Sequence, residues 1–397
     1  MTNKHVKYNF FYIANPSRDV RANVIQTLAC AKALNSSSLE AVIIIPKRSE
    51  IIESLFKDIN PTYVTGINFA NFFALLKKRS RIWNYLESTI LSFAIGFTLL
   101  KKYKRSSKVF YCREFTVSFW LSMFQRILNA KLISEFHGLE TEIPTKATET
   151  WFQPIIRFSE KYLFKHTSAI ASFTNTFSKK IEKMGYLKKT DKKIKIVPLG
   201  VDETLFLPEN RNKCKKELHL DLKKTYITYA GLTLSYRNIE KVLNTVKNTT
   251  SKKVFFLILG GTPDEVENLI KLSKEMKIED SIRFFGKLDH SLVSKYYGAS
   301  DVLIIPGTWH NDFPPLKLFE YMSAGRKIIC PNLPVFKEIL GTNGIYFSGN
   351  DFADKIENVI KKNKKYEVME KNIYSISKNY TFTKKAEVIS MIASELV

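Results

Sequence analysis

Paired cysteines are missing from this sequence. Its four cysteines, Cys30, Cys112, Cys214 and Cys330, lie far apart among 397 residues. This spacing excludes a zinc knuckle and a disulfide scaffold, and it is typical of a reducing compartment. The amino terminus also lacks a long apolar run that ends in a small-residue cleavage site. We therefore expect a cytoplasmic protein rather than a secreted one.

Long apolar runs are missing as well. The apolar segment Ile90–Leu100 is short and is interrupted by Ser92, Gly96 and Thr98, whereas a helix needs about 20 residues to span a bilayer. No internal repeat of solenoid period and no low-complexity segment is visible in the sequence. The sequence therefore predicts no spanning helix in this segment and no repeat architecture.

Acidic residues are scarce relative to basic ones. The chain has 62 Lys+Arg against 38 Asp+Glu, a formal net charge of +24 and a pI near 9.6. Such an excess indicates an anionic partner, and nucleic acid, an acidic membrane surface and phosphorylated substrates are all candidates. The alternative is a generally lysine-rich composition in which many lysines cover solvated helix faces. The content of 45% hydrophobic and 25% charged residues is that of a globular protein, which excludes wholesale disorder.

Short apolar strands alternate with helices along most of the chain, which is the pattern of parallel sheets with crossover helices. The strands expected in the first half are Asn9–Ala14, Ala41–Ile45, Val109–Cys112, Lys131–Phe136 and Ala169–Phe173. Those expected in the second half are Thr225–Ala230, Val254–Leu259, Ile282–Phe285, Val302–Ile305 and Lys327–Cys330. A lysine-rich polar stretch at 187–195 separates the halves, and we expect the domain boundary within 185–210. We predict domains at 1–190 and 191–375, with a C-terminal helix in 376–397 as a candidate for return to the first domain.

Basic residues surround the apolar segment Ile90–Leu100. Between residues 77 and 108 the only acid is Glu87, and the bases are Lys77, Lys78, Arg79, Arg81, Lys101, Lys102, Lys104, Arg105 and Lys108. One interpretation is a core helix with a solvated basic edge. The other is a monotopic contact of the 69–108 region with an anionic membrane, assisted by electrostatic attraction.

The stretch from Asp301 to Gly325 carries the clearest chemistry. A strand is expected to end near Pro306 and a helix to start close to Leu316, so the amides of Leu316 and Lys317 would be unpaired donors suited to a diphosphate. Glu320 lies one turn further on the same face, where its carboxylate can accept hydrogen bonds from a ribose diol. Asp312 lies eight residues before Glu320, on the loop that meets the group the diphosphate carries.

This stretch, Asp312-Phe-Pro-Pro-Leu-Lys-Leu-Phe-Glu320-Tyr-Met-Ser-Ala-Gly325, resembles the Glu-x7-Glu region of retaining family-4 glycosyltransferases. Asp312 replaces the first Glu of that region. Three further segments are similar to the same family in the same order: Lys131–Gly138, Ile196–Asp202 and Tyr229–Arg237. The resemblance implies an α/β protein of the GT-B fold, with two Rossmann-like parallel-sheet domains facing a cleft.

The resemblance also implies roles for individual residues. His137 would face the donor sugar, Arg237 would grip the diphosphate, and Asp312 would contact the donor sugar, which makes these three the catalytic candidates. The nucleotide sugar would be bound by the following residues: Gly231, Arg237, Gly286, Lys287, Leu316, Lys317 and Glu320. Leu232 occupies a place where many members of the family have Arg, and Lys317 would compensate. The acceptor side would involve Arg113, Arg18 and Arg21, and the last two follow a first strand without the usual Gly-Gly loop.

The expected activity is transfer of a sugar from a nucleoside diphosphate sugar with retention of configuration. The family needs no metal, the sequence has no Asp-x-Asp pair in a loop after a strand, and no cofactor is expected beyond the co-substrate. The expected acceptor is a lipid-linked or oligosaccharide precursor of lipopolysaccharide, capsule or another surface glycan, at the inner face of the cell membrane. Two alternatives remain: a nucleotide-sugar epimerase of the same fold, and a basic nucleic-acid-binding protein, against which stands the lack of a nucleic-acid motif.

Overall fold

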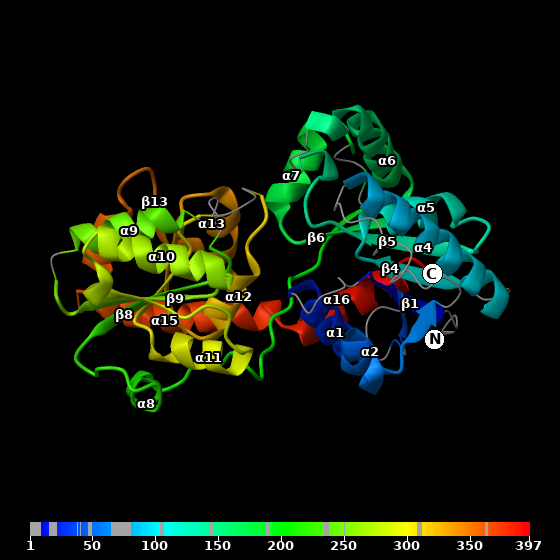
Figure 1. Ribbon diagram of the computed structural model, residues 1–397. Coiled ribbons are helices and arrows are strands. Elements are labelled where there is room, and N and C mark those ends of the chain that lie inside the picture. Colours follow the sequence, from blue (N-terminus) through cyan, green and yellow to red (C-terminus); the bar gives the residue numbers. More distant parts are fainter. Residues whose placement is uncertain are drawn as a thin grey trace. The chain divides into compact units, whose positions relative to one another are not determined.

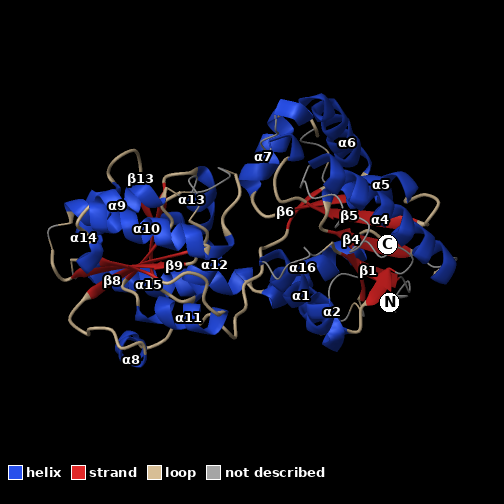
Figure 2. Ribbon diagram, in the orientation of Figure 1, coloured by secondary structure: helices blue, strands red, loops and turns tan. Residues whose placement is uncertain are grey.

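The chain folds into two compact units in a computed structural model. The structure describes residues 9–15, 22–37, 39, 41–46, 50–64, 81–103, 107–142, 147–187, 191, 193–233, 238–249, 251–307, 312–361 and 364–397. The first unit comprises the chain up to Gly200 together with Phe382–Val397, and the second unit is Val201–Thr381. Each unit is a sheet covered by helices on both faces (Figures 1 and 2).

The first unit is built on a seven-stranded parallel sheet in the order β3-β2-β1-β4-β5-β6-β7. Its strands are β1 (Asn9–Ile13), β2 (Val42–Pro46), β3 (Thr62–Val64), β4 (Lys108–Cys112), β5 (Ala130–Glu135), β6 (Ala169–Ser172) and β7 (Ile194–Ile196). Near-continuous aliphatic runs such as Val42–Ile45 suit strands buried on both faces. The strand order reverses direction between β1 and β4, which in such sheets marks the ligand-binding edge.

Helices from both ends of the chain cover the first sheet. They are α1 (Ala22–Asn35), α2 (Glu50–Phe56), α4 (Arg81–Lys102), α5 (Phe115–Phe124), α6 (Gln153–His166), α7 (Asn175–Lys183) and α16 (Phe382–Glu395). The last of these, α16, packs beside α1 and buries Ala386, Ile389, Ile392 and Ala393 in the core with β1 and β2. The C-terminal helix is therefore a structural part of the first unit.

The second unit repeats the architecture with six parallel strands in the order β10-β9-β8-β11-β12-β13. The strands are β8 (Thr225–Ala230), β9 (Val254–Leu259), β10 (Ile282–Phe284), β11 (Val302–Ile304), β12 (Lys327–Pro331) and β13 (Ile345–Phe347). The helices are α8 (Arg211–Glu217), α9 (Ile239–Asn248), α10 (Pro263–Glu275), α11 (His290–Ala299), α12 (Leu316–Ser323), α13 (Pro334–Leu340), α14 (Phe352–Val359) and α15 (Lys364–Ser377). The predicted fold class, two Rossmann-like parallel-sheet domains, is confirmed.

The chain passes from the first unit to the second within the expected region 185–210, although the limits of the units differ from the predicted 190 and 376. The first unit continues to Gly200 rather than ending at 190, because β7 pairs with β6 and so keeps residues 194–196 in the first sheet. The chain returns at Phe382 rather than at 376, because α15 still packs against α12 in the second unit. Within the described part of the chain, no helix is long and apolar enough to cross a membrane.

The basic segment around Ile90–Leu100 is only partly described. The apolar run belongs to the 22-residue helix α4, while Lys77, Lys78, Arg79, Lys104 and Arg105 lie outside the described residues. The prediction that Lys108 is one of the surface cations is wrong. Lys108 is buried at the start of β4 and donates a hydrogen bond of 2.9 Å to the Leu128 carbonyl, because a strand central to the sheet has no solvated face.

Candidate functional site

The carboxyl edge of the second sheet brings the start of α12 next to the ends of two strands. Strand order reverses between β8 and β11, and ligands of such sheets bind outside the strand ends at this point. The Tyr321 hydroxyl of α12 accepts a hydrogen bond of 2.9 Å from the Ala230 amide and lies 3.4 Å from the Ile304 carbonyl. One side chain thus fastens α12 to the last residues of both β8 and β11.

The first turn of α12 presents backbone donors. The helix begins after Pro315, which has extended backbone (φ −67°, ψ 146°) and gives the helix no side-chain cap. The first amides of a helix have no carbonyl partner within it, so those of Leu316 and Lys317 remain available to an anion. Both residues are half-buried. The sequence predicted this arrangement, and the structure supplies the helix start at the expected residue.

Glu320 is held in place one turn into α12. Its Oε2 accepts hydrogen bonds of 2.9 Å from both the Lys317 ammonium and the Tyr297 hydroxyl, and its side chain is 13% exposed. Burial, and then the adjacent Glu320 charge, raise the pKa of Tyr297 well above its ordinary value, so Tyr297 stays a hydrogen-bond donor at neutral pH. The carboxylate therefore has a fixed orientation and still reaches the surface.

Glycines line the neighbouring strand ends. The backbone of Gly260 approaches Gly231 so closely that a Cβ on Gly260 would collide with the Gly231 carbonyl, and the Gly260 amide donates 2.7 Å to the Gly286 carbonyl. All three have positive φ (150°, 112° and 65° for Gly231, Gly260 and Gly286), which favours glycine. The sequence predicted Gly231 and Gly286, with exposed Lys287 beside the latter. It missed Gly260, although two consecutive glycines directly after a strand were a readable signal.

The carboxyl edge of the first sheet holds a buried carboxylate with four donors. Glu135 is the last residue of β5. Its carboxylate accepts hydrogen bonds of 2.9 Å from Arg113 Nε, 2.8 Å from His137 Nε2 and 2.7 Å from Lys385 Nζ. The Tyr111 hydroxyl donates to the same carboxylate. The Glu135 side chain is fully buried, whereas His137 is 42% exposed. His137 thus lies at the surface while its ring is anchored from below.

Charge compensation sets the protonation of this cluster. Although burial opposes it, the Lys385 and Arg113 charges hold the pKa of Glu135 well below its ordinary range. Desolvation lowers the pKa of His137, and the hydrogen bond to Glu135 only partly offsets this. The ring is therefore neutral at pH 7, and an ionised Glu135 requires the proton on Nε2. His137 Nδ1 is left as a hydrogen-bond acceptor.

The remaining predicted residues are Arg113 and Asp312, which the structure describes, and three arginines that it does not. Arg113 lies at the predicted edge, but its side chain is only 9% exposed and donates to Glu135, Tyr12 and Thr27, so its charge is directed inward. Asp312 is half-buried before α12. Arg18, Arg21 and Arg237 lie outside the described residues. The structure brings Leu316, Lys317 and Glu320 together and also Gly231 and Gly286.

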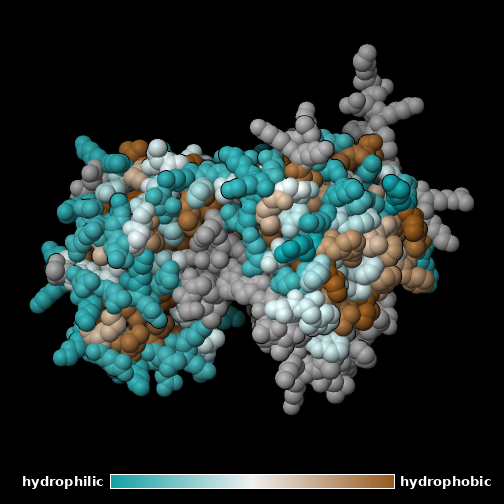
Figure 3. Space-filling model, turned by 90° about the horizontal axis from the view of Figure 1, so that it is seen from above, coloured by the Kyte–Doolittle hydropathy of each residue, from teal (hydrophilic) through white to brown (hydrophobic). Residues whose placement is uncertain are grey.

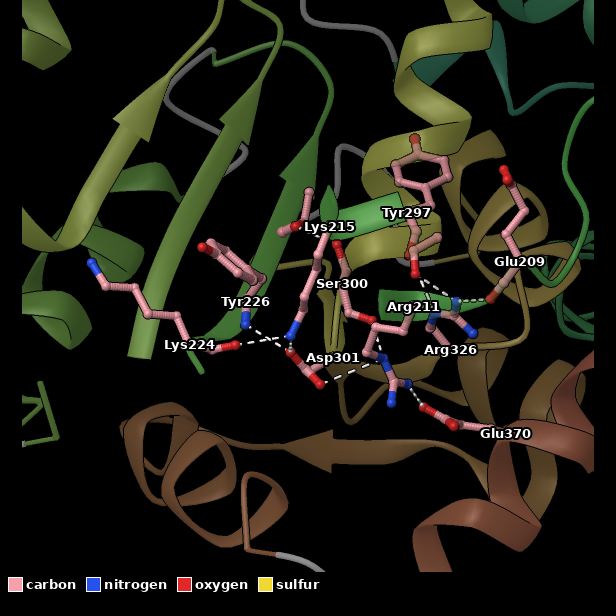
Figure 4. Close-up of polar contacts among 12 residues, drawn as sticks. Glu209, Arg211, Lys215, Lys224, Tyr226, Tyr297, Ser300, Asp301, Arg326 and Glu370 are labelled. Carbon is pink, nitrogen blue, oxygen red and sulfur yellow. Dashed lines mark hydrogen bonds and ion pairs between the residues drawn. The ribbon is translucent and has the colours of Figure 1, made fainter. Parts of the chain in front are cut away.

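A second charged cluster lies at the opposite, amino edge of the second sheet (Figure 4). Asp301 lies directly before β11. Its carboxylate pairs with Lys215 Nζ at 3.1 Å and with Arg211 Nε at 3.4 Å, and it accepts a hydrogen bond of 2.9 Å from the Tyr226 amide. Arg211 also pairs with Glu370 of α15 at 2.8 Å. Because ligands bind at the carboxyl edge, we assign this cluster to the packing of α8 and α15. Among the residues that the structure describes, no group of three or more His, Cys, Asp or Glu side chains is arranged to hold a metal.

Residues 210–376, nearly all of the second unit, match the family of glycosyl transferases group 1. A D-inositol 3-phosphate glycosyltransferase of Actinosynnema mirum is 23% identical over 186 residues, 42% of this chain and 43% of that protein. An alpha-monoglucosyldiacylglycerol synthase of Streptococcus pneumoniae is 24% identical over 43% of this chain and 40% of its own. An O-antigen chain mannosyltransferase of Salmonella typhimurium is 22% identical over 32% of this chain and 36% of its own. The matches span less than half of each relative's length.

Solved structures are similar over nearly the whole chain. Sucrose-phosphate synthase from Thermosynechococcus elongatus superimposes with a TM-score of 0.76 at 14% identity, covering 98% of this chain and 99% of its own. Anabaena HepE in complex with UDP gives 0.75 at 12% identity, covering 98% and 100%. At such identities these structures establish the two-domain GT-B fold and leave the activity to be argued from the site.

Proposed function

We propose that this chain, whose residues 210–376 match the family of glycosyl transferases group 1, transfers a sugar from a nucleoside diphosphate sugar to an acceptor with retention of configuration. The start of α12 carries the proposal, because backbone amides, the Lys317 ammonium and the Glu320 carboxylate meet there at the switch point of the sheet. Amides and ammonium suit a diphosphate, and a carboxylate suits the hydroxyls of a ribose.

The chemistry proposed for this site is stabilisation of a departing diphosphate. Negative charge grows on the leaving oxygen as the bond to the sugar breaks, and the α12 amides and the Lys317 ammonium are proposed to stabilise this charge. The sequence adds Arg237 to this group. The leaving oxygen then assists removal of the acceptor proton on the same face of the sugar. The proposed reaction uses no metal and no cofactor.

His137 is proposed to bind a hydroxyl of the donor sugar. Its Nδ1 is an acceptor in the neutral ring that Glu135 holds, so it suits a hydroxyl that donates. Asp312 is proposed to contact the same sugar from the loop before α12. Arg113 acts in this proposal through Glu135, as a positioning residue, rather than by touching the acceptor.

The proposed acceptor is a lipid-linked precursor of a surface glycan. The relatives include, by name, an alpha-monoglucosyldiacylglycerol synthase and an O-antigen chain mannosyltransferase, and the chain's net charge of +24 favours activity at an anionic membrane. We propose a cytoplasmic enzyme that acts peripherally at the inner face of the cell membrane.

The test uses the full chain with UDP-, GDP- and ADP-linked sugars and a membrane extract as acceptor. Nuclear magnetic resonance of the product should show a new glycoside with the anomeric configuration of the donor. Inverted configuration would overturn the proposed stereochemistry. Release of free sugar alone, or of an epimerised nucleotide sugar, would overturn the transferase proposal and favour the epimerase.

Glu320→Ala is expected to weaken nucleoside diphosphate binding by roughly 10- to 150-fold, since a hydrogen bond to a charged acceptor contributes about 1.5–3 kcal/mol. Isothermal titration calorimetry measures the affinity. Tyr297→Phe is the matched control, because it removes the hydroxyl that orients Glu320 and keeps the carboxylate, so the loss should stay below about tenfold. Undiminished binding by Glu320→Ala would exclude this residue from the site.

A further inference from the structure

Helix α4 of the first unit is apolar on its exposed side as well as on its packed side. Its packed side buries Leu91, Ile95 and Leu99 together with Ser88 and Ser92, and the Ser92 hydroxyl donates a hydrogen bond of 2.6 Å to the Ser88 carbonyl. Its exposed large apolar residues are Trp83, Leu86, Phe93, Phe97 and Leu100. Their spacing of three, four or seven residues places them on one stripe of the helix, so burial in the unit does not explain why this stripe is apolar.

The two helices beside α4 extend this stripe into a continuous face. In and after α5, Met123 and Ile127 are 42% and 71% exposed, and on α6 Ile155 and Phe158 are 42% and 62% exposed. Trp151, just before α6, is 63% exposed. We call these residues together with the α4 stripe the three-helix face. In Figure 3, seen from above, brown and tan surface is visible on the unit at the right.

Aromatic contacts join the three helices across this face. The ring of Phe93 lies 5.1 Å from that of Trp120, Trp120 lies 5.2 Å from Phe119, and Phe119 lies 6.5 Å from Phe158. The Trp120 Nε1 group also donates 3.0 Å to Thr89 of α4. The exposed side chains therefore stand on a packed support, and a platform of this kind presents them together.

The charges around the face identify its partner. In α4, α5, α6 and the turn Ala147–Phe152 that carries Trp151, the acids are Glu87, Glu149 and Glu160, and Glu160 is buried. The bases are Arg81, Lys101, Lys102, Arg157, Lys161 and Lys165. Lys101, Arg157, Lys161 and Lys165 are exposed. A second copy of the chain on this face would bring like charges together, whereas an anionic bilayer offers both lipid tails for the apolar stripe and phosphates for the bases.

We propose that the three-helix face is a lipid-docking surface that seats Phe97, Ile127 and Phe158 among the headgroups and upper acyl chains of an anionic bilayer. The function of this surface rests on the proposed transfer to a lipid-linked acceptor. The geometry of the surface is independent of that proposal. The face is broader than the 69–108 segment that the sequence indicated, because α5 and α6 supply part of it.

The test is flotation of the full chain with phosphatidylcholine vesicles, with and without phosphatidylglycerol. We expect binding to the anionic vesicles only. Phe97→Gln/Ile127→Gln/Phe158→Gln should reduce binding about tenfold or more at low and high salt. Lys101→Gln/Arg157→Gln/Lys161→Gln should remove the dependence on phosphatidylglycerol and on salt. The control, Leu222→Gln/Ile270→Gln/Val368→Gln, changes exposed apolar residues of the second unit and should bind as the unaltered chain does.

Three results would overturn the docking surface: no binding to anionic vesicles, equal loss in the control, or a dimer in light scattering that the Phe97 triple variant dissociates. Nucleotide affinity, measured in the same samples without vesicles, separates this proposal from the proposed function. Vesicle binding without sugar transfer would leave the surface standing and remove the transferase. Transfer to a soluble acceptor without vesicle binding would leave the transferase standing and remove the docking surface.

Discussion

Glu135 is the residue on which the first unit's carboxyl edge depends. Two cations, one hydroxyl and one imidazole donate to a carboxylate that has no access to water. A buried charge of this kind is tolerated only while its partners remain. The same carboxylate fixes the tautomer of His137, so stability and the proposed sugar contact share one group.

Glu135→Gln is expected to lower the free energy of unfolding of the first unit by about 3–5 kcal/mol at pH 7, because Arg113 and Lys385 remain buried without a countercharge. The Glu135 pKa lies well below the ordinary 4.5, so the unfolded chain binds this proton first as the pH falls. The unaltered protein therefore loses the carboxylate's contribution below about pH 4.5. The difference between the two proteins should shrink there. Urea unfolding at pH 7 and at pH 3.5 measures it.

Lys385→Met is the control for this prediction. It removes one donor and leaves Glu135 compensated by Arg113, so the loss should be smaller than for the glutamine variant. A difference between Glu135→Gln and the unaltered protein that is equal at both pH values would contradict the assigned ionisation.

Single residues were predictable where a local signal existed. His137 precedes Gly138 at the end of a strand, and Glu320 follows Lys317 by one helical turn, so both could be placed from the sequence. The Lys385 contact could not, because it joins residues 250 positions apart and depends on which helix returns to the first sheet. Nor did the sequence indicate that Arg113 turns inward.

At the scale of elements, ion pairs hold helices against the amino edge of the second sheet. Asp301 connects the start of β11 to α8 through Lys215, whose side chain is 5% exposed, and Arg211 continues the connection to α15. Helix α8 has only seven residues and would be marginal alone. Its position therefore depends on these pairs together with its packing against α11.

Asp301→Asn is expected to destabilise the second unit by about 1–3 kcal/mol, because the buried Lys215 ammonium loses its countercharge and keeps the Lys224 carbonyl and the Tyr226 ring as partners. Thermal unfolding monitored by circular dichroism measures this. Lys213→Gln on the same helix breaks an exposed pair with Glu217 at 3.9 Å and should change stability by less than about 0.5 kcal/mol. Equal effects of the two variants would show that burial does not matter here.

Most strands were predictable, including the short edge strand β10, which the sequence indicated as Ile282–Phe285, but three other edge strands were not. β3, β7 and β13 have three residues each, too few to show a period against their polar flanks. For α4 the sequence indicated the apolar segment Ile90–Leu100 and left open whether it is a core helix or a membrane contact. The helix begins earlier, at Arg81, and Ser88 and Ser92 lie on its packed side.

At the scale of the whole molecule, the first unit is discontinuous. Its core contains Ile389 and Ile392 of α16 next to residues of β1 and β2, while the second unit is a single run of chain. The two places where the chain passes between the units lie side by side. Val201 forms a β-bridge with Thr381, and Gly200 packs so tightly on the Phe382 ring that a Cβ would overlap it. The second unit is thus inserted into the first.

Ile389→Ala is expected to destabilise the first unit by about 2–5 kcal/mol, since Ile389 is fully buried and the side chain leaves a cavity. Met391→Ala, two residues further on, is the matched control, because Met391 is 64% exposed and should cost less than about 0.5 kcal/mol. Urea unfolding should show only the first unit's transition moving. A shift of the second unit's transition by Ile389→Ala would contradict the division into two units.

The insertion sets an order of events during synthesis. Chains with consecutive domains fold the amino-terminal one first as it leaves the ribosome. Here residues 201–381 are all translated before Phe382, which takes roughly 10–40 s at ordinary elongation rates. The second unit is complete while the first still lacks α16. During that interval the faces of β1 and β2 that α16 will cover stay open to water. The nascent chain therefore presents a hydrophobic surface to chaperones on the first unit, although synthesis of this unit began first.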